Sequence, residues 1–156
     1  MTTPSVRPLD SARHPFEIFV LSWGLAVGLP LLWGAPKPGS TTEVLGPDLA
    51  RVWAWILVIG CLTALAGAWW TALARLVSRW PRLHPAPITG LLLERVGLVS
   101  TATGTIIYAY GVLEVVGLGG GIPAGIVGGF GIACLWRAGQ IHRWVRATIR
   151  RQDDTP

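Results

Sequence analysis

Four long apolar stretches, separated by polar or glycine-rich connections, set the pattern of this chain. A helix needs about 20 mostly apolar residues to cross the hydrocarbon core of a bilayer. The stretches 16–33, 49–73 and 88–116 reach or approach that length, and 119–136 does so when its leading glycines join the helix. The pattern therefore predicts an all-α integral membrane protein whose four transmembrane helices form one domain, 15–136.

The two flanking segments are polar and lie outside this predicted domain. Residues 1–14 contain Pro4 and Pro8 and predict a disordered arm. Residues 137–156 carry five arginines, with apolar and basic side chains on separate stripes of a predicted amphipathic helix. A basic amphipathic helix with tryptophan lies on an anionic membrane surface. The predicted surface anchors are Arg137, Arg143, Trp144, Arg146 and Arg150.

Composition agrees with a membrane protein. Of the 156 residues, 51% are hydrophobic and 13% are charged, against roughly a quarter charged in an average soluble domain. These values argue against an ordinary soluble globular domain. The net charge is +5, but no motif interleaves the basic residues with base-stacking aromatics, so we expect no nucleic-acid partner.

The distribution of basic residues predicts the orientation of the helices. Ten of the 13 Lys and Arg residues lie in the N-terminal arm, the second connection and the C-terminal tail, which share one side of a four-helix protein. The opposite side holds Lys37 and Arg51. Because cytoplasmic loops are enriched in Lys and Arg, both termini are predicted to be cytoplasmic, with the tail on the anionic inner leaflet of a bacterial plasma membrane.

Two helices carry regular rows of small residues. In the third stretch, glycine recurs every seven residues, a spacing that returns to nearly the same helical face. In the fourth stretch, small residues recur every four. Small residues let membrane helices approach closely, so both rows predict packing within the protein or between copies in a homo-oligomer. The predicted packing residues are Gly90, Gly97, Thr101, Gly104, Gly111, Gly121, Gly125, Gly129 and Ala133.

Glu94 and Arg95 are the ionisable pair nearest the middle of a predicted span. If the third helix begins at residue 88, both lie inside the membrane, where an ionisable side chain indicates function. If the span begins at residue 96, both lie at the inner interface and serve as structural groups. Neighbouring helical residues do not face each other, so the expected partners of Glu94 are Arg75, Arg79 or Arg82.

No known catalytic spacing occurs in the chain. It contains no nucleophile elbow, phosphate-binding loop or metal-ligand spacing of histidine and cysteine, so we expect neither an enzyme nor a cofactor or metal.

One segment resembles a known class of proteins. Leu92-Leu93-Glu94-Arg95-Val96-Gly97-Leu98, followed by a small-residue helix with Tyr108 and Tyr110, is similar to small membrane proteins of tailed phages that infect high-GC bacteria. Some of these proteins are holins, and twelve arginines against one lysine are typical of such genomes. The resemblance implies a self-associating inner-membrane protein that permeabilises the host membrane during lysis, with a cell-wall hydrolase as an indirect partner. Holins share no active site, so no residue role carries over.

Two other functions fit the same sequence. The first is a structural or regulatory membrane partner, such as a superinfection-exclusion factor or an accessory subunit. The second, less favoured, is a small channel or transporter that uses Glu94.

Overall fold

The chain is helical wherever the structure describes it. The computed structural model describes residues 15–33, 39–70 and 87–153. Its elements are α1(Pro15–Leu32), α2(Gly39–Ala68), α4(Pro87–Val116), the 3-10 helix η2(Gly117–Gly120) and α5(Gly121–Asp153). These ranges contain no strand, which confirms the predicted all-α class.

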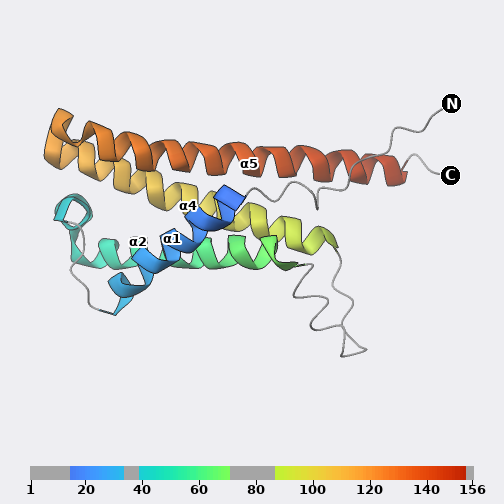
Figure 1. Cartoon of the computed structure of the whole chain (residues 1–156), viewed down its shortest axis with the longest axis horizontal. Coiled ribbons are helices and arrows are strands. Elements are labelled where there is room, and N and C mark those ends of the chain that lie inside the picture. The colour runs from blue at the N-terminus through green and yellow to red at the C-terminus, as the bar shows by residue number, and fades with distance from the viewer. Residues whose placement is uncertain (1–14, 34–38, 71–86, 154–156) are drawn as a thin grey trace.

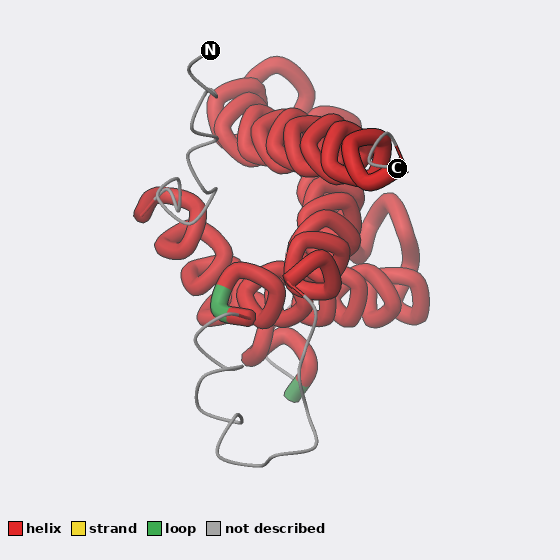
Figure 2. The backbone as a smooth tube through the Cα atoms, turned by 90° about the vertical axis from the view of Figure 1, so that its right-hand side faces the viewer, coloured by secondary structure: helices red, strands yellow, loops and turns green. Residues whose placement is uncertain are grey.

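α2 and α4 form the central helix pair, α1 contacts α2, and α5 contacts α4. α2 and α4 lie antiparallel, α5 turns back along α4, and α1 packs on α2 (Figure 1). Viewed along the long axis, α1 and α5 lie at opposite edges of the α2–α4 pair and face each other (Figure 2). Within the described ranges, α1 and α5 make no direct backbone packing. The space between α1 and α5 is therefore bounded by α2 and α4.

Glycine makes two sharp changes of direction in the backbone. Gly46, with φ at 73°, interrupts α2 just before Pro47, and Gly117, with φ at 63°, ends α4. Residues with a β-carbon rarely adopt these positive φ angles, so glycine suits both places. Gly117 allows α5 to fold back along α4. Gly46 marks the kink between a short helical segment, which begins at Gly39, and the main part of α2.

The bounds of the predicted helices differ from the observed ones mainly in α2 and α5. α2 begins at Gly39 rather than at residue 49, because the turn before Gly46 is helical. α5 is one continuous helix of 33 residues, about 50 Å long, so the predicted fourth span and the predicted helix of the tail join without a break at residues 136 and 137. The helix continues because Ala138 and Ile141 are buried in the same core as the preceding turns. The predicted arm, 1–14, and residues 71–73 lie outside the described residues.

Two helical stretches are long and apolar enough to cross a membrane. They are Thr42–Ala68 and the run Ile88–Ala147, which combines α4, η2 and α5. Glu17–Leu32 is a shorter apolar helix. The core lies between α2 and α4, where Leu57 and Leu98 are buried, and α5 adds Ile141 to it.

Candidate functional site

Three members of the glycine row of α4, namely Gly97, Thr101 and Gly104, lie at the interface with α2. Gly90, Gly97, Thr101, Gly104 and Gly111 are all buried. A β-carbon on Gly97 would contact the Ala64 backbone nitrogen, would lie 2.6 Å from Ala64 Cα and would lie 2.7 Å from the Gly60 carbonyl oxygen. The two backbones therefore touch at this crossing.

The matching small residues on α2 were not among the predicted packing residues. Gly60 faces Thr101, and a β-carbon on Gly67 would contact the backbone of Glu94. Gly60, Ala64 and Gly67 are all buried. Their spacing of four and three residues is a signal that sequence reasoning alone could have used.

The small-residue row of α5 points away from the bundle. Gly125, Gly129 and Ala133 are exposed, Gly121 is half-buried, and a β-carbon on any of the three glycines would meet no atom within 4 Å. The face of α5 that packs on α4 instead carries Ala124, Gly128, Gly131 and Cys134. A side chain added at any of these three glycines would thus have free space among the described residues.

The exposed row forms the floor of a shallow apolar groove between α4 and α5. The groove has a volume of about 530 Å³. Gly121, Gly125 and Gly129 lie in its floor, and Tyr110 and Leu113 of α4 belong to its wall.

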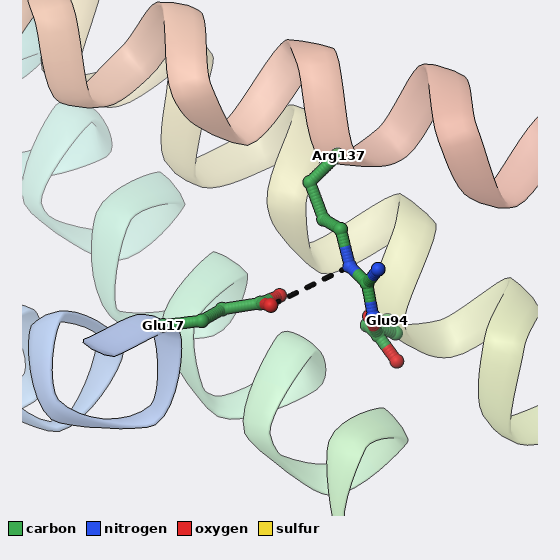
Figure 3. Close-up of polar contacts among 3 residues, drawn as sticks. All are labelled: Glu17, Glu94 and Arg137. Carbon is green, nitrogen blue, oxygen red and sulfur yellow. Dashed lines mark ion pairs between the residues drawn. The ribbon is translucent and has the colours of Figure 1, made fainter. Parts of the chain in front are cut away.

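A cluster of charged side chains joins three helices (Figure 3). Arg137 of α5 places Nη2 3.3 Å from Glu94 Oε1 on α4, and Nε 3.4 Å from Glu17 Oε2 on α1. The Glu94 side chain is 9% exposed, and the other two side chains are about one-sixth exposed. Since removing charges from water is costly, the opposite charges have to compensate each other here.

The structure places Arg137, one of the predicted surface anchors, in this cluster with its side chain 16% exposed. It occupies the level of Glu94 because α5 continues past residue 136 and brings residue 137 over the interior of the bundle. Among the described residues, Arg137 is an ion-pair partner of Glu94. The predicted partners Arg75, Arg79 and Arg82 lie outside the described residues.

The other predicted charged residues occupy the far part of α5 and one position beside Glu94. Arg95 is half-buried and follows Glu94 along α4, so it points in a different direction. Arg143, Arg146 and Arg150 are exposed and Trp144 is half-buried. The guanidinium of Arg143 lies 5.9 Å from the centre of the Trp136 ring, close enough for a cation–π contact.

A second cavity, of about 360 Å³, lies between α1 and α5 with its floor on α2 and α4. Trp23 and Val27 line it from α1, and Val127 and Phe130 from α5. Trp53 and Tyr108 form part of the floor, where their rings stack with centres 5.9 Å apart and planes inclined by 19°. Sequence reasoning did not find this cavity, because its walls come from four separate helices.

Several polar groups in the cavity floor already have partners. Trp53 Nε1 donates to the Gly104 carbonyl oxygen at 2.7 Å. Thr105 Oγ1 donates to the carbonyl oxygens of Thr101 and Ala102, and Thr101 Oγ1 donates to Cys61 Sγ. The floor thus presents mainly hydrocarbon and aromatic surface to an occupant.

No group of three or more His, Cys, Asp or Glu side chains in residues 15–33, 39–70 and 87–153 is arranged to hold a metal ion. Comparison with known proteins returns no match to a family model, to a curated protein or to a solved structure.

Proposed function

We propose that the chain is a non-enzymatic bacterial inner-membrane protein that self-associates through the exposed groove of α4 and α5 and permeabilises the membrane in the manner of a holin. The observation that carries this proposal is the outward position of Gly125, Gly129 and Ala133. A row of small residues that faces away from its own bundle offers close approach to another helix.

The outer surface supports a membrane location. Large apolar side chains are exposed along every helix, including Phe19 on α1, Ile59 on α2, Val96 on α4 and Ile132 on α5. Soluble monomers rarely expose contiguous apolar patches beyond a few hundred Å². Lipid tails would cover these side chains, with four helices crossing the bilayer and both termini in the cytoplasm.

A second copy is the occupant that best matches the groove. Each copy carries both the small floor and large exposed side chains in the same groove, such as Tyr110 and Ile132, that would contact the floor of a partner. In lipid, such association depends on van der Waals packing, which requires close backbone approach. Repeated contacts of this kind would build the assembly that opens the membrane and gives a cell-wall hydrolase access to its substrate.

The test compares two glycine substitutions on the same helix. Gly125→Leu fills the floor of the groove, whereas Gly139→Leu makes the same change at an exposed glycine outside the groove where a β-carbon meets no atom within 4 Å. The proteins are expressed in a bacterial host, cross-linked in membranes, and assayed for uptake of a membrane-impermeant dye.

We expect wild type and Gly139→Leu to form oligomers and admit dye, and Gly125→Leu to remain monomeric and exclude it. Oligomers of Gly125→Leu at the wild-type level would contradict the proposed interface. Exclusion of dye by wild-type cells at high membrane expression would contradict the permeabilising role.

A further inference from the structure

The cavity between α1 and α5 is open to the outside of the bundle. Trp23 and Ile126, on opposite walls, are 62% and 69% exposed while also lining the cavity. Trp53 and Leu57, on the floor, are almost fully buried. The opening therefore lies between α1 and α5, on the side that faces lipid in the proposed membrane orientation.

The cavity is elongated along the helices. On α1 its lining extends from Val20 to Leu31, which corresponds to about 16 Å of helix. Half of a bilayer's hydrocarbon core, the length of one leaflet of lipid tails, is about 15 Å. The length of the cavity therefore matches one lipid tail.

The volume agrees with this length. An apolar protein cavity of about 150 Å³ holds one benzene ring. At the same volume per carbon, the 360 Å³ of this cavity would hold a chain of roughly 14 carbons. Because Trp53 and Thr105 already donate to backbone carbonyl groups, their side chains favour a hydrocarbon occupant over a polar one.

The charged cluster lies beyond one end of the cavity along α1 and α5. Glu17 precedes Val20 by about one helical turn, and Arg137 follows Phe130 by two turns. The ion pair between Glu17 and Arg137 bridges α1 and α5, which make no direct backbone packing in the described ranges. This bridge holds the two walls at a fixed separation at the end where the lining stops.

We propose that this cavity is a binding site for one hydrocarbon chain of a membrane lipid, which enters between α1 and α5. The driving force is dispersion contact with the aromatic and aliphatic walls, because a lipid tail is already in an apolar medium. The head group stays outside the cavity, so the site selects chain length rather than head group.

The experiment measures lipid that stays bound when the full-length protein is transferred from bilayers to detergent. The protein is first held in nanodiscs of phosphatidylethanolamine and phosphatidylglycerol, and retained lipid is then counted by native mass spectrometry. Val127→Trp fills the cavity from α5 and Val27→Trp fills it from α1. Ile122→Trp, at a residue of α5 that is 78% exposed and outside the lining, is the matched control.

We expect one retained lipid on wild type and on Ile122→Trp, and loss of most of it from both cavity-filling variants. Retention at the wild-type level in a folded Val127→Trp or Val27→Trp protein, or no retained lipid on wild type, would overturn the proposal. Helical circular dichroism identifies the folded variants.

A competition series on wild type does not depend on any variant. Single-chain maltoside detergents should displace the lipid more effectively as the alkyl chain lengthens to about 14 carbons, and no better beyond that length. Displacement that does not depend on chain length would contradict a chain-sized cavity.

The site is independent of the self-association proposed above. Gly125→Leu changes the groove on the other side of α5 and should retain the lipid even as a monomer. Loss of lipid from Gly125→Leu would assign the bound molecule to the interface between copies and overturn the cavity site.

Discussion

The crossing of α2 and α4 predicts opposite effects for the same substitution at two glycines of one helix face. At Gly97, an added β-carbon would lie 2.6 Å from Ala64 Cα and 2.7 Å from the Gly60 carbonyl oxygen. At Gly104, the nearest atom would be Leu57 Cδ1 at 3.4 Å, which is ordinary contact. Alanine should therefore force the helices apart at the first position and fit at the second.

The expected free energies follow from these distances. Overpacking costs about 1–3 kcal/mol, and the upper end applies to Gly97 because backbone atoms cannot rotate away. Replacing glycine by alanine within a helix favours folding by about 1 kcal/mol. The free energy of unfolding should fall by about 2 kcal/mol in Gly97→Ala and rise by about 1 kcal/mol in Gly104→Ala. The difference of about 3 kcal/mol corresponds to roughly a hundredfold change in the unfolding equilibrium.

The assay is reversible unfolding in mixed micelles, titrated with a denaturing detergent and followed by helical circular dichroism. Gly139→Ala, on the exposed face of α5, measures the contribution of helix propensity alone. Equal shifts in Gly97→Ala and Gly104→Ala, or a more stable Gly97→Ala, would refute the close backbone contact between α2 and α4.

Two further predictions use the same unfolding assay. Arg137→Leu should lower the free energy of unfolding by about 3–5 kcal/mol, because it leaves Glu17 and Glu94 without this partner in the bundle, whereas Arg143→Leu, at an exposed cation–π contact, should cost about 1 kcal/mol or less. Equal losses in these two variants would contradict the role of the cluster. Trp53→Phe should cost about 1 kcal/mol for its hydrogen bond to the Gly104 carbonyl oxygen, whereas Trp70→Phe should not cost this amount, because the buried Trp70 Nε1 has no hydrogen-bond partner among residues 15–33, 39–70 and 87–153. A larger loss in Trp70→Phe than in Trp53→Phe would refute that reasoning.

The local parts of the fold could be predicted from the sequence, and the contacts between helices could not. Apolar length alone located the described helices, because a chain with so few charged residues has long uninterrupted apolar runs. Apolar length ends the predicted fourth span at residue 136 and gives the tail a separate amphipathic helix, but it does not show that the two helices are continuous. In the structure, α5 continues, and Arg137 reaches Glu94, which lies 43 positions earlier in the chain.

For the glycine rows too, the local spacing could be predicted from the sequence, and the contacts between helices could not. Spacing shows that Gly97 and Gly104 share one narrow helical face, but spacing alone does not show which helix packs there. It also could not separate the α4 row, which is buried against α2, from the α5 row at Gly125 and Gly129, which is exposed. That difference depends on how far α5 is rotated about its axis as it packs on α4. The cavity between α1 and α5 could not be predicted from the sequence for a related reason, because its lining comes from four helices.

Disulfide cross-linking across α5 tests the central proposal most directly. In a variant whose native cysteines, Cys61 and Cys134, are replaced by alanine, Gly129→Cys puts a thiol on the exposed row, where a β-carbon has free space. Leu135→Cys puts one on another exposed face of the same helix, outside the groove. In oxidised bacterial membranes, we predict cross-linked dimers for Gly129→Cys and few for Leu135→Cys. Equal cross-linking at both positions, or cross-linking at Leu135→Cys alone, would contradict association through the α5 row.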